Sequence, residues 1–323
     1  PRLAQSTGYI FLTLNSGSVH NKGIELSVNA TPVKTRDFTW DLTLNLSGNR
    51  GTLGDFLPGV SLFYVTDVQI GGVKAASVPN GGYFLGLTGD HWMVEKDEEG
   101  NEIPGGRYIV DEATGLYAPT TQTTNVVGNR EPDFIGGLNN NLRYKNLNFS
   151  FLFDIRKGGD IYNGTDYYLT INGLSAKTLG RESVTVSGVS KTTGEPVSYT
   201  YEAGKTYTVG GASKSGEYMI QQYWGINGYG VNAYNFITNT NWLRLRSVNL
   251  SYDFTDLIGN RGFIKGLSAS IGGYNLLLWT NYKGMDPEVS VSGSGTGGSG
   301  SMGIDYCGVP ATRNVTFGIN ATF

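Results

Sequence analysis

Cysteine, histidine and charge are scarce in this sequence, and each scarcity excludes a class of protein. The single cysteine, Cys307, cannot form a disulfide within the chain. The two histidines, His20 and His91, lack metal-ligand spacing, and no G-x-S-x-G nucleophile motif occurs. Charged residues make up 16% of the chain and the net charge is −3, which argues against a nucleic-acid-binding surface. We therefore expect no enzyme: no catalytic residue, no metal site, no cofactor and no nucleic-acid partner.

Long apolar runs are also missing, which excludes a transmembrane helix. The longest apolar patch is LLLW at 276–279, far short of the run of about 18 residues that a spanning helix needs. A β-barrel, however, crosses a membrane with alternating segments of about ten residues. The absence of apolar runs therefore leaves insertion by strands open.

Alternation of apolar and polar residues is the dominant pattern, and helical periodicity is rare. In FTWDLTLNLS (38–47) every second residue is apolar, and RNVTFGINATF (313–323) alternates to the last residue of the chain. In WLRLRSVNLSYDF the phase slips, which predicts a β-bulge near Arg246 and Ser247. The predicted antiparallel strands are 20–31, 37–48, 133–144, 147–157, 241–254, 265–279 and 310–323. A further pair within 80–115 would raise their number from seven to nine.

The predicted connections differ in length at the two ends of the strands. Short turns lie at 32–37, 144–146 and 255–265, and long loops at 50–132, 158–240 and 280–309. This asymmetry is typical of outer-membrane barrels, whereas a soluble sandwich more often has short turns at both ends. Seven or nine strands cannot close a barrel with an even number of strands. We therefore expect an all-β fold that is part of a large antiparallel transmembrane β-barrel.

The apolar face of these strands is expected to contact lipid. The opposite face carries small hydrophilic residues that suit a wet lumen. Aromatic residues near the strand ends would form girdles at the two membrane interfaces. They are Trp40, Tyr144, Trp242, Tyr252, Trp279 and Phe323.

Five ordered motifs resemble one known family. They are NKGIELSVNATPVKTRDFTWDLTLNLSGN, GGLNNNLRYKNLNFSFLFDIRKGGDIYN, NWLRLRSVNLSYDF, YNLLLWTNYKGMDPE and GVPATRNVTFGINATF. In order and content they are similar to the C-terminal third of SusC/RagA-type TonB-dependent transporters of Bacteroidota outer membranes.

The resemblance implies a location in the bacterial outer membrane and a full barrel of roughly 22 strands with a plugged lumen. It implies a SusD-like surface lipoprotein as a lid, uptake of oligosaccharides or peptides driven by TonB, and compatibility with a dimer of transporter–lipoprotein pairs. The plug, the TonB-contacting segment and the N-terminal strands are absent here. Residues 1–323 are therefore expected to be the C-terminal portion of such a barrel, coupled to TonB only through the missing part.

Three groups of residues are candidates for structural roles. Arg244 and Arg246 are expected to point into the lumen and to pair with plug carboxylates or with wall residues such as Asp253 or Asp154. The family-like Asp286, Pro287 and Glu288 are expected to form a structural turn, in which Pro287 stiffens the chain and Asp286 bonds neighbouring backbone. The terminal strand resembles the signal read by the barrel-assembly machinery, carried by Thr316, Gly318, Ala321 and Phe323.

The predicted loop region 158–240 holds ten of the twenty tyrosines. Tyrosine and tryptophan offer a flat apolar face with a hydrogen-bonding edge, which suits sugar rings and protein surfaces alike. Substrate contact, lipoprotein contact and loop packing therefore all remain open for these residues. The candidates are Tyr167, Tyr168, Tyr223, Trp224, Tyr229 and Tyr234.

Alternatives to an importer stay open at this point. A passive porin would lack a plug in the whole gene, and an adhesin would bind at the surface without uptake. An outer-membrane enzyme would need clustered catalytic groups at a strand end, which the two isolated histidines do not supply.

Overall fold

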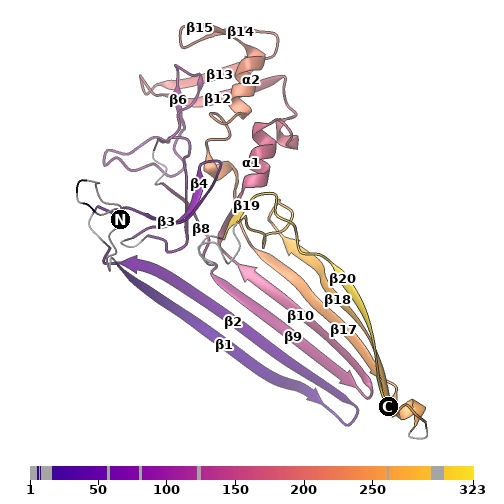
Figure 1. Ribbon diagram of the computed structural model, residues 1–323. Coiled ribbons are helices and arrows are strands. Elements are labelled where there is room, and N and C mark those ends of the chain that lie inside the picture. Colours follow the sequence, from indigo (N-terminus) through magenta and orange to yellow (C-terminus); the bar gives the residue numbers. More distant parts are fainter. Residues whose placement is uncertain are drawn as a thin grey trace.

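The fold was analysed in a computed structural model of the chain. It describes residues 17–56, 59–79, 82–121, 125–259, 262–291 and 302–323, together with Ser6 and Gly8. Figure 1 shows two parts: a long antiparallel sheet, here called the wall, and a loop body above one end of it. The loop body is built from the long connections 55–133, 158–241 and 281–313.

The wall consists of seven antiparallel strands, each paired with the strand next to it along the wall. They are β1 (Ser18–Lys34), β2 (Phe38–Gly54), β9 (Phe134–Tyr144), β10 (Leu147–Lys157), β17 (Trp242–Asp253), β18 (Gly266–Thr280) and β20 (Asn314–Thr322). The predicted strands are thus confirmed. The further pair considered within 80–115 does not join the wall, since β5 (Gly86–Thr88) and β6 (Ile109–Asp111) belong to sheets of the loop body.

The register of the wall keeps the apolar residues on one face. Phe149 of β10 lies opposite Leu250 of β17, and Ile271 of β18 lies opposite Phe317 of β20. The predicted bulge is present, because the pairing of β17 with β18 shifts between Leu245 and Ser247. One extra residue there restores the alternation that two successive polar residues would otherwise break.

The apolar face of the wall is open, and no described residue covers it at the two outer strands, β1 and β20. Ile24 of β1 is 79% exposed, and Phe317 and Ile319 of β20 are each 78% exposed. Monomeric soluble proteins rarely leave a continuous apolar surface of this kind open to water. In the described part of the chain no helix has the length and apolar character needed to cross a membrane.

One polar residue lies on this apolar face and is satisfied locally. Asn140 of β9 stands opposite Leu42 of β2 and is only 4% exposed. Its side-chain oxygen accepts the indole N–H of Trp40 at 3.1 Å. The indole N–H of Trp40 is therefore bonded inside the wall, to Asn140.

The loop body contains short helices and short strands, and the strands form four small sheets. Besides β5 and β6, its strands are β3 (Phe63–Ile70), β4 (Val73–Ser77), β7 (Leu116–Tyr117), β8 (Val126–Asn129), β11 (Asp160–Asn163), β12 (Ser183–Ser190), β13 (Pro196–Glu202), β14 (Thr206–Val209), β15 (Ala212–Ser215), β16 (Ile237–Asn239) and β19 (Ile304–Asp305). Its helices are α1 (Gly164–Ile171), α2 (Gly216–Trp224) and the 3-10 turns η2 (Ala176–Thr178) and η3 (Ala233–Asn235). The short helix α3 (Thr255–Ile258) lies in the turn between β17 and β18.

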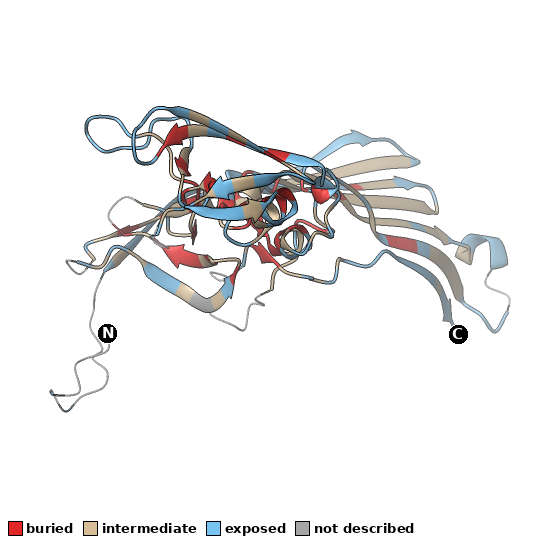
Figure 2. Ribbon diagram, turned by 90° about the horizontal axis from the view of Figure 1, so that it is seen from above, coloured by how far each residue is buried: buried red, intermediate tan, exposed pale blue. Residues whose placement is uncertain are grey.

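The three long connections interlock. Strand β11 pairs with β16 of its own connection and with β19 of the third, and β12 pairs with β6 of the first. One apolar core joins Val73 and Leu87 of the first connection, Tyr162 and Phe236 of the second, and Ile304 of the third. Figure 2 shows that most buried residues lie in this body, whereas the wall strands are mainly intermediate or exposed. Residues 158–240 thus fold together with the other two connections.

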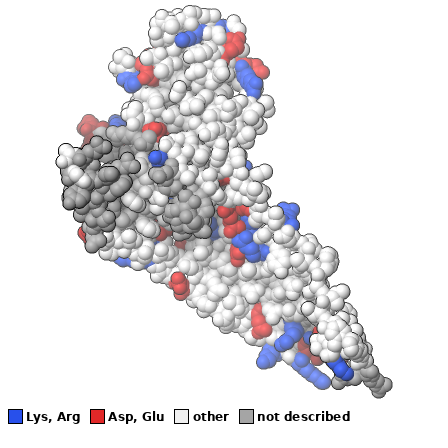
Figure 3. Space-filling view, viewed as in Figure 1, with Lys and Arg blue, Asp and Glu red and all other residues white. Residues whose placement is uncertain are grey.

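Charge is unevenly distributed over the molecule. On the face shown in Figure 3 most of the surface is uncharged, and Lys and Arg gather at the turn end of the wall. The turns at that end carry Lys34, Arg36, Arg143 and Lys145. Lys and Arg are costly to place in the middle of a bilayer and cheap near its surface, so they indicate an end of the wall that stays in water.

Candidate functional site

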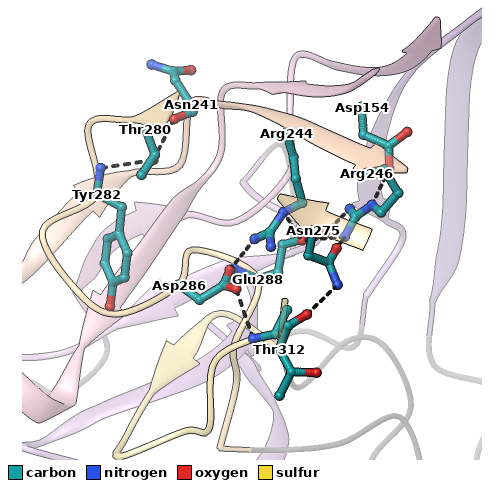
Figure 4. A network of polar contacts seen from close by, with 11 residues as sticks. Asp154, Asn241, Arg244, Arg246, Asn275, Thr280, Tyr282, Asp286, Glu288 and Thr312 are labelled. Carbon is teal, nitrogen blue, oxygen red and sulfur yellow. Dashed lines mark hydrogen bonds and ion pairs between the residues drawn. The ribbon is translucent and has the colours of Figure 1, made fainter. Parts of the chain in front are cut away.

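A network of charged residues lies on the polar face of the wall, next to the loop body (Figure 4). Arg244 of β17 donates from Nη2 to Asp286 Oδ1 at 2.6 Å, and both side chains are 3% exposed. The Nε atom of Arg244 is 2.9 Å from Glu288 Oε2. A buried guanidinium therefore has two carboxylates beside it, both supplied by the third connection.

Arg246, on the same face, joins the wall to the same connection. Its Nε donates to Asp154 Oδ2 of β10 at 2.6 Å, and its Nη2 donates to Glu288 Oε1 at 2.9 Å. The expected pairing of Arg246 with the wall residue Asp154 is thus present. Asp253 takes no part, because it lies at the turn end of β17, where it accepts the backbone N–H of Thr255.

The segment 281–291, here called the strap, is fixed by this network. Asp286 also accepts the backbone N–H groups of Glu288 at 3.0 Å and Ala311 at 3.2 Å, which are the backbone bonds expected of it. The Tyr282 hydroxyl donates to Asp305 Oδ2 at 2.6 Å. The contacts of Asp286 with Arg244 and of Glu288 with both arginines were not predicted. The sequence holds two arginines on β17 and two carboxylates in the strap, but these residues are about 40 positions apart, so no local pattern joins them.

A hollow of about 800 Å³ opens on the polar face beside this network. Residues of five wall strands and of the strap line it, and the polar ones include Glu25, Asn45, Asp154, Arg246 and Glu288. Carboxylates, amides and guanidinium groups together can hold water, ions or polar groups of a partner by hydrogen bonds. The arrangement provides a wet inner surface and binding groups.

Neither histidine belongs to a reactive cluster. His91 Nε2 is 2.9 Å from Glu102 Oε1, and His20 Nε2 is 3.0 Å from Ser18 Oγ. Among the residues that the structure describes, no three His, Cys, Asp or Glu side chains come together as a metal site requires. The geometry therefore offers binding and support, and no catalytic group is assigned.

The tyrosine candidates divide into buried and accessible members. Tyr167 is 6% exposed and belongs to the apolar core that joins the three connections, so its ring packs within the loop body. Tyr223, Trp224 and Tyr229 are partly buried, and their rings contact one another with centroids 5.0 to 6.3 Å apart. Burial raises the pKa of Tyr223 to about 12, so its hydroxyl stays protonated at neutral pH.

Tyr168 and Tyr234 are the accessible members, with 39% and 51% of their surface exposed. The chemistry of an exposed phenol allows stacking and hydrogen bonding to a ligand or a protein. Contact of any of the six aromatic candidates with substrate or partner stays a prediction.

Thr316, Gly318 and Ala321 lie on β20, as the alternation predicted, and Phe323 follows directly after it. Ala321 lies opposite Leu267 of β18, and Gly318 lies opposite Ser270. The ring of Phe323 contacts Phe263, with centroids 4.9 Å apart. Thr316 lies opposite Gly272. The role of these four residues as an assembly signal stays a prediction.

Comparison with known proteins identifies relatives that cover nearly the whole chain. No family model matches it. The TonB-dependent receptor P26 of Formosa agariphila is 29% identical over 99% of this chain, which corresponds to 31% of that receptor. The TonB-dependent receptor SusC of Bacteroides thetaiotaomicron is 25% identical over 97% of this chain, which corresponds to 27% of SusC. The chain thus spans less than a third of the length of these relatives.

Solved structures agree on the fold. The RagAB peptide transporter matches with a TM-score of 0.60 and 19% identity, over 100% of this chain and 31% of that one. The RagAB peptide importer in its open-open state also gives 0.60, at 15% identity. These relatives are receptors and transporters, which agrees with the expectation of a protein that is not an enzyme. In sequence and in fold, the chain is similar to the barrel-wall part of SusC/RagA-type TonB-dependent transporters.

Proposed function

We propose that this chain forms the C-terminal part of the wall, with its loops, of an outer-membrane importer that takes up nutrients by a TonB-dependent mechanism. The observation that carries the proposal is the two-sided wall. Its apolar face is open, with Phe317 78% exposed, and its polar face carries the network around Arg244 and Arg246. A lipid exterior and a wet interior satisfy both faces at once.

The loop body is proposed to face the outside of the cell and to meet a SusD-like lipoprotein. Three interlocked connections give it a core of its own, so it offers a shaped surface instead of three independent loops. The exposed Tyr168 and Tyr234 are of the residue type that protein interfaces favour. The substrate is proposed to be a glycan or a peptide, and the pairs of transporter and lipoprotein to form a dimer. Coupling to TonB belongs to parts of the protein outside this chain.

Uptake by the full-length protein tests this function. A strain that carries the gene should import fluorescently labelled oligosaccharide or peptide, and should lose import when TonB is deleted. Import that continues without TonB would favour the passive porin. Surface binding without import in either strain would favour the adhesin.

Purification of the full-length protein from its own membrane tests the lipoprotein partner. It should recover a surface lipoprotein in equal amount, and its absence would contradict the proposed lid.

A further inference from the structure

A second hollow lies in the loop body, away from the polar face of the wall. It has a volume of about 510 Å³ and opens between the C-terminal end of α1 and the exposed side of α2. Pockets for small ligands usually measure roughly 300–1,000 Å³. The lining comes from α1 and its following turn (Ile171, Asn172, Gly173), from Thr178 and Arg181, and from α2 (Glu217, Ile220, Gln221, Trp224).

The turn after α1 is held in the shape that forms one side of this hollow. Gly173 has φ +70°, a left-handed conformation that favours glycine. Its carbonyl accepts from Arg181 Nη2 at 2.7 Å, and the carbonyl of Thr178 accepts from Arg181 Nε at 3.2 Å. Two of the three guanidinium nitrogens of Arg181 are thus fixed. Within the described residues Nη1 remains for a ligand.

The α2 side supplies a carboxylate and an amide. Glu217 Oε1 accepts the backbone N–H of Gly204 at 2.6 Å. Hydrogen bonds from its own backbone N–H and then from that of Gly204 hold the pKa of Glu217 below its ordinary value, so it is ionised at neutral pH. Gln221, one turn further along α2, brings both a donor and an acceptor. Asn172 donates to Tyr168 O at 2.8 Å and keeps its side-chain oxygen as an acceptor.

Apolar side chains complete the lining. Ile220 is buried, and the indole of Trp224 packs against Tyr229 and Tyr223 with ring centroids 5.0 and 5.1 Å away. A flat aromatic surface held by its neighbours can receive the C–H face of a sugar ring, while the planar polar groups beside it meet the hydroxyls.

The charges of this hollow favour a neutral ligand. Arg181 and Glu217 are the two ionised groups in the lining, and their charges cancel. Each is already hydrogen-bonded to backbone, so neither requires a counter-ion from the ligand. The donors and acceptors of the lining that are still available surround the indole ring of Trp224. Separate donors and acceptors of this kind suit the adjacent hydroxyl groups of a sugar.

We propose that the hollow between α1 and α2 is a binding site for a neutral oligosaccharide, in which Trp224 stacks on a sugar ring while Arg181, Glu217 and Gln221 bond its hydroxyls. The inference rests on the proposed function, since that function makes the loop body accessible from outside the cell. It names the substrate class and a place where it is first captured.

Binding to the purified full-length protein tests the site. Maltohexaose, cellohexaose, xylohexaose, laminarihexaose and a neutral hexapeptide are titrated separately, and affinity is measured by calorimetry. We expect at least one hexasaccharide to bind, with affinity reduced at least tenfold in Gln221→Ala and lost in Arg181→Ala. Gln222→Ala, the neighbouring amide on α2 that does not line the hollow, is the matched control and should bind as the unchanged protein does.

The outcomes separate this site from the transport function. A hexasaccharide whose affinity falls in Gln221→Ala and not in Gln222→Ala supports the site, with circular dichroism confirming that each variant is folded. Binding of no hexasaccharide, equal affinity in all variants, or binding of the peptide alone would overturn it. TonB-dependent uptake is measured in parallel, so the site can fail while import stands, and import can lose its TonB dependence while the site binds.

Discussion

The wall and the loop body use the same sequence pattern in opposite ways. Strand β12 of the body alternates as the wall strands do, and its Val184 and Val186 are 8% and 0% exposed. Ile24, an apolar residue of the alternating strand β1 in the wall, is 79% exposed. Alternation therefore defines a strand with two different faces, and the surroundings determine whether the apolar face meets protein or lipid.

The difference follows from how the strands are connected. Wall strands of 9 to 17 residues pair with one another in a single sheet, and within the described residues no second sheet packs on its apolar face. Body strands are at most 8 residues long and belong to small sheets, whose apolar faces pack against α2 or against other loops. A layered fold buries its apolar faces internally, and a single sheet cannot.

The largest expected effect concerns the joint between the two regions. Asp286→Ala leaves the guanidinium of Arg244 buried with one partner fewer, and breaking a buried ion pair costs about 3–5 kcal/mol. We expect the strap to detach and the full-length protein to unfold at a lower temperature, measured by the loss of its folded band on SDS gels after heating.

The double variant Arg244→Met with Asp286→Leu provides the control. It replaces the ion pair with apolar side chains and leaves Glu288 paired with Arg246. The part of the loss that comes from an unpaired buried charge should therefore return, whereas the backbone bonds that Asp286 accepted stay lost. Equal losses in the single and double variants would show that the shape of the strap matters more than its charge.

The next effect is confined to the loop body. Ile304 is fully buried where the three connections meet, and truncation of such a residue to alanine costs about 2–5 kcal/mol. Ile304→Ala should therefore speed proteolytic cleavage of the long connections while the wall stays folded. Val309→Ala, in the same connection but 84% exposed, should cleave at the original rate. Unfolding of the wall together with the body would contradict the division into two regions.

A charged residue placed on the apolar face of the wall distinguishes lipid from protein surroundings. Phe151 lies in the middle of β10, opposite Val248, and arginine on the lipid face of a barrel costs about 2–4 kcal/mol near the midplane. Phe151→Arg should lower stability by that amount in phospholipid vesicles, measured by guanidinium titration. Ser150→Arg, one residue earlier on the polar face, should have a much smaller effect. Similar effects of both substitutions would mean that lipid contacts neither face.

The wall was predictable from the sequence, because strand alternation is a local property. Seven strands, their order and the bulge at Arg246 all follow from residues close together in the chain. The loop body was not predictable, because its sheets join residues of different connections, as β12 joins β6. Tyr167 illustrates the consequence: a candidate for ligand contact in the sequence, it is packed in a core that includes Ile304.

The smallest expected effect concerns the hydrogen bond between Trp40 and Asn140 on the apolar face. Trp40→Phe removes the donor to Asn140 and leaves a buried amide oxygen without its partner, at a cost of about 1–3 kcal/mol. In lipid no water can replace the indole N–H, so the loss should appear in vesicles, and Asn140→Leu in the same variant should recover it. Trp279→Phe, whose ring is 49% exposed, serves as the control. Unchanged stability of Trp40→Phe in vesicles, or no recovery by Asn140→Leu, would show that this buried hydrogen bond contributes nothing to the wall.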